Sequence, residues 1–433
     1  MNIRRPHFNF SATALRTIAR SCVFLASLCS LGIADVAFAA ERTDKADTAA
    51  LVQSLRAHAM PIRLQDGRLH GPGAEWISRE SADAQFVLIG EDHGMAEAPG
   101  IATALWNAGG FRQLVIEAGP YATAAMNDAL QKDPDGLAAI NARFPTSIPF
   151  FNWREDGAMA AAAVASRHRD ALCGVDQEFI LSGRPLFRAL AELAPDAAAK
   201  RLALGYATRD DAMYVAMTTQ RDADSNLLTK LEAKDFDALR KAFRTRRDAI
   251  ALIDDLATSA DIYRLQSTDP GRSNAMRSTL MKRNFMRCLR REGDSTAAPR
   301  MLFRMGAFHV GRGRSPLGLF DLGNLASELA QSNGMRSLHL LVIASGGHVN
   351  RWFPFAPEDA SKRADYDAKS ELGMIGAGAL IDAADARGWT LIPFAPLRTD
   401  AALRKAGGEK FDQLVFAYDA VVVVPDAQAA TLY

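Results

Sequence analysis

Two carboxylates and a histidine stand between glycines in the segment Gly90–Gly94, which has the sequence Gly-Glu-Asp-His-Gly. Four apolar residues at 86–89 precede it and predict a buried strand, and a helical pattern follows at 101–106. Such a segment places ionisable groups at the carboxyl end of a strand, where open α/β folds build their sites. A histidine there can accept or donate a proton near neutral pH. The alternative is a polar turn in which Asp92 and His93 only cap the next helix.

Three further apolar runs end in ionisable residues, namely Glu117, Asp176 and His309. In a parallel sheet all these strand ends lie along one edge, so we expect them to converge with Glu91 and His93. Each residue taken alone could be a helix cap or a core histidine. Ionised side chains crowded at a sheet edge are costly to desolvate unless they are paired, and the coincidence therefore predicts a functional site.

A cation for this site is available from the helical pattern around Arg277. Arg277, Met281 and Asn284 are spaced i, i+4 and i+7, which places them on one face of a helix. We expect Arg277 and Asn284 to point toward the sheet edge, with Met281 packed between them. Basic residues nearby in the sequence leave a solvated helix face as the alternative.

The elements that must position these residues follow an α/β pattern. Apolar runs alternate with helical patterns up to Asp176 and again after residue 301, which predicts a mostly parallel central sheet flanked by helices. Between them the chain lacks strand-like alternation and has helical spacing throughout. We therefore predict a core in two parts, 40–184 and 292–433, with an inserted all-helical subdomain at 185–291.

The first 39 residues have the pattern of a secretory signal peptide. Four arginines precede an apolar run from Cys22 to Ala34, and Ala37-Phe38-Ala39 forms a small-residue cleavage signal. The apolar run is too short for a comfortable membrane span. We predict cleavage after Ala39 and a periplasmic or secreted protein without stable membrane insertion, with an uncleaved anchor as the alternative.

The charge balance argues against one class of function, nucleic-acid binding. The chain carries 51 basic and 50 acidic residues, and this near balance provides no surface for a nucleic acid. Two cysteines lie outside the signal peptide, Cys173 in a predicted strand and Cys288 in a predicted helix. Sequence does not give the distance on which a disulfide depends, and we expect two buried free thiols.

Several catalytic signatures are missing from the sequence. There is no Gly-x-Ser-x-Gly elbow, no His-Glu-x-x-His helix and no Cys-x-x-Cys pair. The glycine spacing at Gly306–Gly311 is followed by Arg312-Gly313 in place of Lys-Ser/Thr, which argues against a phosphate loop. Because no activated serine or cysteine is evident, direct attack by water is favoured over a covalent intermediate.

The order of the motifs resembles the erythromycin esterase-like family over roughly residues 80 to 425. The resemblance is carried by Gly90-Glu91-Asp92-His93-Gly94, Ile116-Glu117-Ala118-Gly119, Asn152-Trp153, Gly174-Val175-Asp176, Arg277-x-x-x-Met281-x-x-Asn284 and His309-Val310-Gly311-Arg312. It implies an α/β core with a helical insert and hydrolysis of an ester by activated water. It also implies that His93 is the general base, and it matches the family's acidic residue and later histidine to Glu117 and His309.

Two departures from the family pattern open other hypotheses. Only Asp92 separates Glu91 from His93, where the family usually has two residues, and Gly306 stands where the family usually has a further histidine. Both histidine motifs consequently have the form Gly-x-x-His. That pair also resembles the Tiki/TraB-type metalloproteases, and the haem-binding lipoproteins of the ChaN type share a related layout.

Our leading hypothesis is a secreted hydrolase of a small-molecule ester that needs no cofactor. His93 removes a proton from water, with Glu91 or Glu117 holding its ring. Arg277 stabilises the oxyanion, and His309 protonates the leaving group or helps to place the water. The residues predicted to contact the substrate are Asp92, Trp153, Asp176 and Asn284.

Two alternatives use the same residues differently. In the first, His93, His309 and a carboxylate such as Glu117 bind a divalent metal, zinc or manganese, with an open position for water. In the second, the protein is a non-enzymatic periplasmic binder in which one histidine binds haem iron.

Overall fold

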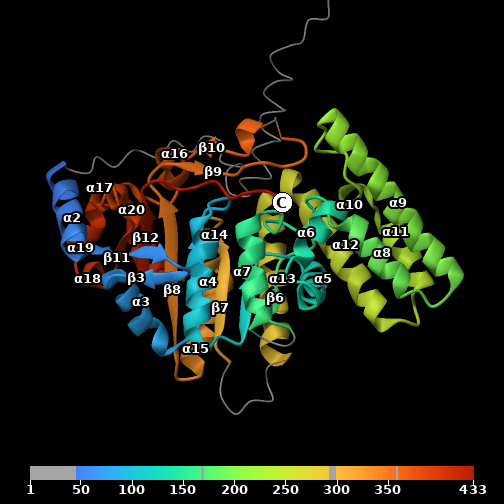
Figure 1. Cartoon of the computed structure of the whole chain (residues 1–433), viewed down its shortest axis with the longest axis horizontal. Coiled ribbons are helices and arrows are strands. Elements are labelled where there is room, and N and C mark those ends of the chain that lie inside the picture. The colour runs from blue at the N-terminus through green and yellow to red at the C-terminus, as the bar shows by residue number, and fades with distance from the viewer. Residues whose placement is uncertain (1–44, 167–169, 292–298, 357–358) are drawn as a thin grey trace, which may run out of the picture.

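The computed structural model describes residues 45–166, 170–291, 299–356 and 359–433. The predicted signal peptide at residues 1–39 lies outside these ranges. Within them, no helix combines the length and the apolar character that a membrane span requires. The chain forms a sheet with helices on both of its faces and a helical body at one side (Figure 1).

An eight-stranded sheet forms the centre of the molecule. Its strand order is β1 (Met60–Pro61), β11 (Thr390–Pro393), β12 (Ala420–Val424), β8 (Arg336–Ala344), β4 (Ala84–Glu91), β7 (Met301–Gly306), β5 (Gln113–Ile116) and β6 (Leu172–Gly174). The six strands from β12 to β6 run parallel to one another. At one edge, β11 pairs antiparallel with β12 on one side and with β1 on the other. The predicted α/β fold with a mostly parallel sheet is therefore confirmed.

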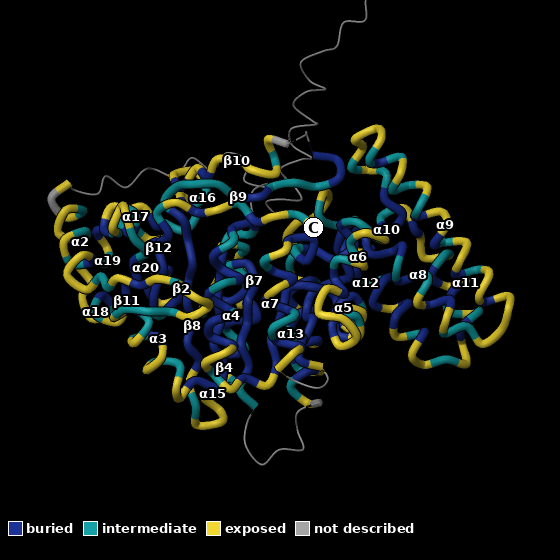
Figure 2. Tube along the Cα trace, in the orientation of Figure 1, coloured by how far each residue is buried: buried dark blue, intermediate teal, exposed yellow. Residues whose placement is uncertain are grey.

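Burial explains why these sequences form strands. Every residue of β4, β7 and β12 is buried, as expected for a parallel sheet covered on both faces. The tube coloured by burial shows the same pattern (Figure 2). The flanking helices are α2 (Lys45–His58), α3 (Pro72–Ala82), α4 (Glu97–Gly109), α5 (Pro120–Lys132), α6 (Gly136–Arg143), α7 (Arg154–Ala165), α14 (Ala307–Val310), α15 (Leu322–Ser332), α16 (Ala368–Gly373), α17 (Gly378–Ala383), α18 (Ala395–Arg398), α19 (Ala401–Ala406) and α20 (Gly408–Ala417).

Short elements complete this part of the chain. Two small antiparallel pairs are formed by β2 (Arg63–Gln65) with β3 (Arg68–His70) and by β9 (His348–Val349) with β10 (Ala364–Asp365). The pair of β9 and β10 matters for the site, because the chain directly after β9 contacts the loop that carries His93.

In the described residues between β6 and β7, six helices follow one another. They are α8 (Gly183–Glu192), α9 (Ala197–Gln220), α10 (Leu227–Lys230), α11 (Ala233–Ala242), α12 (Arg247–Thr268) and α13 (Pro270–Arg291). Most of them share a hydrophobic core of their own that includes Phe187 and Phe243. Met281 and Phe285 of α13 pack instead in the core of the sheet. The last helix thus joins the two bodies, and the domain boundaries at 185 and 291 stay a prediction.

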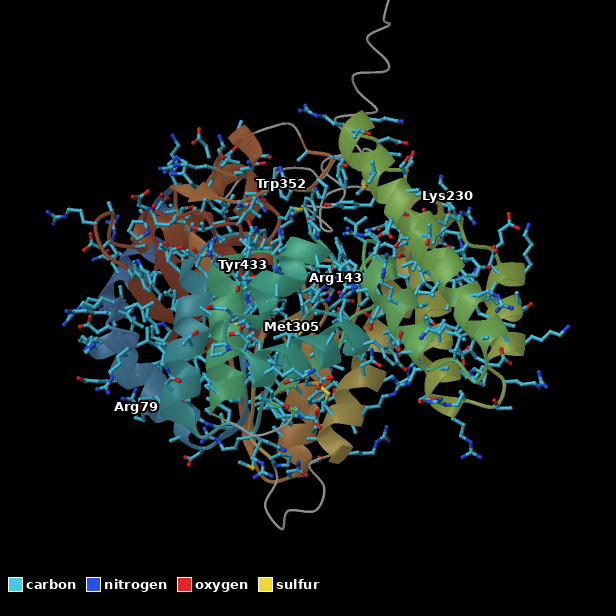
Figure 3. The ribbon with its side chains drawn as sticks, turned by 45° about the vertical axis from the view of Figure 1, so that its right-hand side comes forward. Arg79, Arg143, Lys230, Met305, Trp352 and Tyr433 are labelled. Atoms are coloured by element: carbon cyan, nitrogen blue, oxygen red, sulfur yellow. A yellow bond between two sulfur atoms is a disulfide. The ribbon has the colours of Figure 1, made fainter. Side chains whose placement is uncertain are left out.

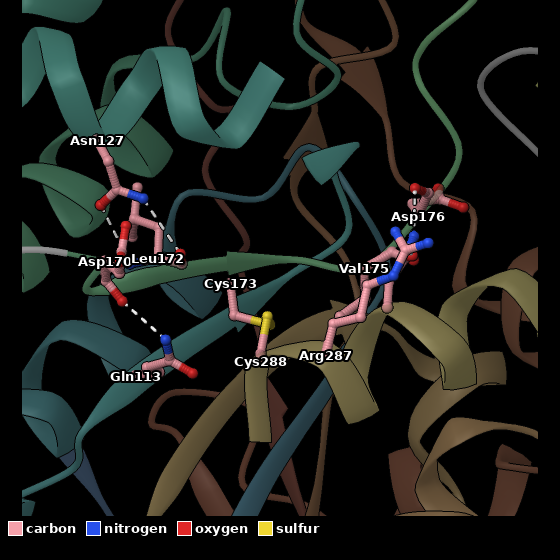
Figure 4. The surroundings of a disulfide bond; sticks show 10 residues. Gln113, Asn127, Asp170, Leu172, Cys173, Val175, Asp176, Arg287 and Cys288 are labelled. Atoms are coloured by element: carbon pink, nitrogen blue, oxygen red, sulfur yellow. Dashed lines mark hydrogen bonds between the residues drawn. A yellow bond between two sulfur atoms is a disulfide. The ribbon is translucent and has the colours of Figure 1, made fainter. Parts of the chain in front are cut away.

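Cys173 and Cys288 form a disulfide bond, so the expectation of two free thiols is wrong. Cys173 lies on β6 and Cys288 on α13, with 6.1 Å between their Cα atoms (Figure 4). The helical segment leaves the sheet after β6 and returns along it as α13, which brings two cysteines 115 positions apart within bonding distance. The bond therefore joins the two ends of the helical segment.

Candidate active site

The predicted residues converge at one edge of the sheet. Glu91 is the last residue of β4, Glu117 follows β5, Asp176 follows β6, and His309 lies on α14, directly after β7. Because β7 is inserted between β4 and β5, the ends of strands that are far apart in sequence lie side by side. The structure thus brings together groups that lie more than two hundred residues apart in the chain, as the parallel-sheet argument predicts.

The first histidine is held by the glutamate two residues before it. His93 Nδ1 lies 2.6 Å from Glu91 Oε1, and its Nε2 lies 3.6 Å from Glu117 Oε2. Glu91 is completely buried, whereas 19% of the His93 side chain is exposed. Gly94 has a φ of 94°, and a Cβ there would lie 2.3 Å from the Asn350 carbonyl oxygen, so only glycine fits this turn.

The second histidine has a matching arrangement. His309 Nδ1 lies 2.8 Å from Asp321 Oδ2, and its Nε2 lies 3.6 Å from Glu117 Oε1. Asp321 caps α15 through the Leu322 N–H and also accepts a hydrogen bond from the Ser278 hydroxyl. The two histidine–carboxylate pairs, Glu91–His93 and His309–Asp321, therefore present their Nε2 atoms to opposite oxygens of Glu117.

Glu117 lies between the two imidazoles and is fully buried. Its Oε1 accepts from Arg277 Nη2 at 2.6 Å and its Oε2 accepts from the Gly306 N–H at 2.7 Å. Burial raises the pKa of Glu117, but His309, His93 and Arg277 outweigh it and lower this pKa to about 2. Glu117 is consequently an anion at neutral pH.

Glycine at position 306 leaves room at the centre of the site. A Cβ on Gly306 would lie 3.0 Å from His93 Nε2 and 3.2 Å from Glu117 Oε2. A side chain there would crowd both groups unless they moved. The glycine at the position that departs from the esterase pattern thus allows the backbone to lie close to His93 and Glu117.

The carboxylates around His309 favour its protonated form. Burial and the charge of Arg277 lower the pKa of His309, but Glu117 and Asp321 act more strongly together, and the net direction is upward. The pKa of Asp321 is lowered in turn, because His309 and the Ser278 hydroxyl outweigh its burial. This pair is therefore suited to donate a proton rather than to accept one.

Arg277 and Asn284 point from α13 toward the sheet edge, where both bind protein groups. Arg277 forms a bidentate ion pair with Asp176, at 2.9 and 2.7 Å, besides its bond to Glu117. Burial lowers the pKa of Arg277, but Asp176 and Glu117 raise it well above its usual value. Asn284 donates to the Val175 carbonyl oxygen at 3.0 Å and so fixes the end of β6.

Asp92, predicted to contact substrate, forms an ion pair with Arg351. Arg351 Nη2 lies 3.2 Å from Asp92 Oδ2 and 2.9 Å from Glu371 Oε1. Arg351 Nη1 also donates to the His93 carbonyl oxygen at 3.5 Å. Arg351 lies just after β9, and no sequence signal connected it with the site. Its contacts hold the backbone of the His93 loop.

The loop that contains Asn152-Trp153, residues 149–153 and here termed the aromatic loop, approaches His93 through Phe150 rather than through Trp153. The Phe150 ring stacks on the His93 ring with 3.8 Å between centroids and an interplanar angle of 19°. Trp153 is 4% exposed, and its ring lies 5.9 Å from that of Phe150. Phe150 has a φ of 66°, the left-handed region that non-glycine residues rarely adopt. The sequence identified the loop but not its contacting residue.

The segment 426–433 joins the His93 loop to the aromatic loop. The Ala430 N–H donates to the Gly94 carbonyl oxygen at 2.9 Å, and the Tyr433 N–H donates to that of Asn152 at 3.1 Å. Isolated β-bridges pair Ala429 with Met95 and Leu432 with Trp153. Tyr433, the last residue of this segment, is labelled in Figure 3. Residues 426–433 therefore support the loop that carries His93 and the aromatic loop whose Phe150 stacks on its ring.

A metal site requires several ligating side chains that converge on one point. Across the residues that the structure describes, no group of three or more histidine, cysteine, aspartate or glutamate side chains is arranged to hold a metal ion. The Nδ1 atoms of His93 and His309 bind carboxylates, and Arg277 binds the carboxylate that lies between them.

Comparison with known proteins finds similar structures but no similar sequence. No protein-family model matches the chain, and no curated protein matches its sequence. Among solved structures, a histidine-to-asparagine mutant of erythromycin esterase EreC in its open conformation is 16% identical, with a TM-score of 0.55 over 86% of this chain and 99% of that one. A succinoglycan biosynthesis protein is 11% identical, with a TM-score of 0.56 over 90% and 100% of the two chains. A Bacillus cereus protein is 13% identical, with a TM-score of 0.52 over 89% and 99%.

These likenesses extend over almost the whole of each solved chain. They show that this protein has an erythromycin esterase-like fold, which confirms at the level of the fold the resemblance that the motifs carry. At identities this low, the reaction has to be argued from the site itself.

Proposed function

We propose that the protein is a hydrolase that cleaves an ester, or a related acyl bond, of a small molecule by water that His93 activates. The observation that carries this proposal is the pair of histidine–carboxylate arrangements that face Glu117. One imidazole can act as base and the other as acid, which is what hydrolysis by direct water attack needs. The esterase-like fold supports a hydrolase of this general kind.

His93 is the proposed general base. Glu91 accepts a hydrogen bond from Nδ1–H, which leaves the lone pair of Nε2 free to take a proton from water as the water oxygen attacks the acyl carbon. Phe150 covers the ring and limits its rotation. General base catalysis of this sort contributes about 10²- to 10⁴-fold to the rate.

His309 is the proposed general acid. The negative charges of Glu117 and Asp321 keep it protonated, so it can donate to the leaving oxygen as the tetrahedral intermediate collapses. The acid product then leaves, the proton held by His93 passes to solvent, and His309 takes up a proton from solvent. Each turnover thereby consumes one water and returns both histidines to their starting states.

Arg277 and Glu117 set the electrostatics between the two histidines. Arg277 is bound by Glu117 and Asp176, so we assign it chiefly to holding Glu117. Stabilisation of the oxyanion then comes from the combined positive charge of Arg277 and protonated His309. Asp176 and Asn284 keep Arg277 and the end of β6 in place, and Asp92 with Arg351 keeps the His93 loop in place.

We also propose that the protein acts outside the cytoplasm, in the periplasm or after secretion. The signal-peptide pattern at residues 1–39 is the primary argument. The Cys173–Cys288 disulfide supports it, because structural disulfides persist in oxidising compartments.

The test is a panel of model esters with varied acyl and alcohol parts, assayed with and without a chelator. We expect turnover by the wild-type protein that survives chelation and falls by at least about 10²-fold in His93→Ala. His58→Ala, an exposed histidine on α2, is the matched control and should keep wild-type activity. Turnover that disappears with the chelator and returns with zinc or manganese would replace this mechanism with a metal-dependent one.

A further inference from the structure

A buried arginine lies in the middle of the strand that leads to His309. Arg304 is flanked by apolar residues on β7, is 1% exposed, and is among the largest fully buried side chains of the described residues. An arginine cannot give up its proton, so its charge must be balanced inside the protein. The carboxylates that neutralise this charge therefore indicate the role of Arg304.

The partners of Arg304 connect it to the proposed base. Its Nη2 lies 2.9 Å from Glu91 Oε1 and 2.8 Å from Asp156 Oδ1. Glu91 Oε1 is also the oxygen that holds His93 Nδ1 at 2.6 Å. Glu91 Oε2, Arg304 Nη2 and both Asp156 oxygens are buried without a hydrogen-bond partner among the described residues, so the contacts of Arg304 are close ion pairs rather than aligned hydrogen bonds. Arg304 and His93 are thus the two groups that fix this carboxylate.

Two neighbours complete the arrangement. Asp156, on α7, is fully buried, and burial raises its pKa to about 7 although Arg304 opposes the shift. The Phe150 ring lies 5.9 Å from the Arg304 guanidinium carbon and stacks on His93. Arg304 therefore lies beside both side chains that hold the His93 imidazole. These are Glu91, which binds its Nδ1, and Phe150, which stacks on its face.

We propose that Arg304 is a positioning residue of the hydrolytic site: it fixes the Glu91 carboxylate and, through Glu91, the orientation and tautomer of His93. This inference rests on the proposed function for its catalytic consequence, but the positioning of His93 is independent of the substrate. The competing view is that Arg304 and Asp156 are a structural ion pair without influence on His93.

Removing both charges separates the two views. Breaking one side of a buried ion pair leaves an uncompensated charge, whereas replacing both partners with neutral side chains of similar size is often neutral or stabilising. The double variant Arg304→Met/Asp156→Asn removes the Arg304–Asp156 pair together and leaves Glu91 paired with His93, so it should fold, which thermal unfolding checks. Asp156→Asn alone is the matched control, because it keeps the contact between Arg304 and Glu91.

Two readouts follow from these variants. Histidine labelled with ¹⁵N reports the tautomer of His93, whose signal is assigned by its loss in His93→Ala. We expect one tautomer, protonated on Nδ1, in the wild type and in Asp156→Asn, and a mixture of tautomers in the double variant and in Glu91→Gln. With an ester that the wild type cleaves, kcat should fall ~10²-fold in the double variant while KM changes little.

The imidazole signal tests the positioning even if no ester is cleaved, so failure of the proposed function and failure of this inference are distinct results. A folded double variant with the wild-type His93 tautomer and wild-type kcat would overturn the inference. A changed tautomer in the double variant with an unchanged one in Asp156→Asn supports it.

Discussion

At the scale of single residues, the site is a balance of buried charges around Glu117. The carboxylate is kept ionised by two imidazoles and Arg277, and it in turn favours a proton on His309. The carboxylates that hold the two histidines differ in setting: Glu91 shares its charge with Arg304, whereas Asp321 receives hydrogen bonds from a hydroxyl and a backbone N–H. We base the proposal that His309 is the proton donor on this difference.

Replacing Asp321 with asparagine tests that assignment. Asp321 helps to raise the pKa of His309, so removing its charge lowers this pKa, and His309 loses its proton at lower pH. The alkaline limb of the kcat/KM profile should therefore move to lower pH in Asp321→Asn. Glu328→Gln, on the same helix α15 but bonded to Asn324, is the control and should leave the profile unchanged. An alkaline limb that stays in place would show that His309 is not the acid.

At the scale of elements, distant segments hold the site together. The His93 loop is tied to β9 by Asn350 and Arg351, and to the aromatic loop by residues 426–433. On the opposite side, α13 carries Arg277 into the site and is bonded to β6 by the disulfide. The helical segment thus begins and ends at a covalent bond between β6, the strand that precedes Asp176, and α13, the helix that carries Arg277.

Removal of the disulfide should weaken the whole fold. The double variant Cys173→Ala/Cys288→Ala should lose about 2–4 kcal/mol of unfolding free energy, because the bond closes a long loop in the unfolded chain. Thermal unfolding with and without reductant measures this effect. Reductant should lower the melting temperature of the wild type toward that of the variant and leave the variant unchanged. Equal melting temperatures in all four samples would mean that the bond does not form in solution.

At the scale of the molecule, sequence predicted what depends on periodicity and strand ends. The apolar run at 86–89, and those before Glu117, Asp176 and His309, predicted the parallel sheet and the convergence of these groups at its edge. Contacts between segments that no local pattern connects were not predictable. Arg304 was one charge in an apolar strand, and the cysteine pair depended on the path of α13 past β6.

The central claim is that His93 activates water to attack the acyl carbon directly. A single turnover with excess enzyme in ¹⁸O-labelled water, using an ester that the wild type cleaves, tests it most directly. We predict one ¹⁸O atom in the released acid and no acyl adduct on protein quenched in acid during the turnover, with turnover reduced at least ~10²-fold in His93→Ala. An acyl adduct on the quenched protein, or label in the carboxylate of Glu117 or Glu91, would reveal a covalent acyl intermediate and contradict the claim.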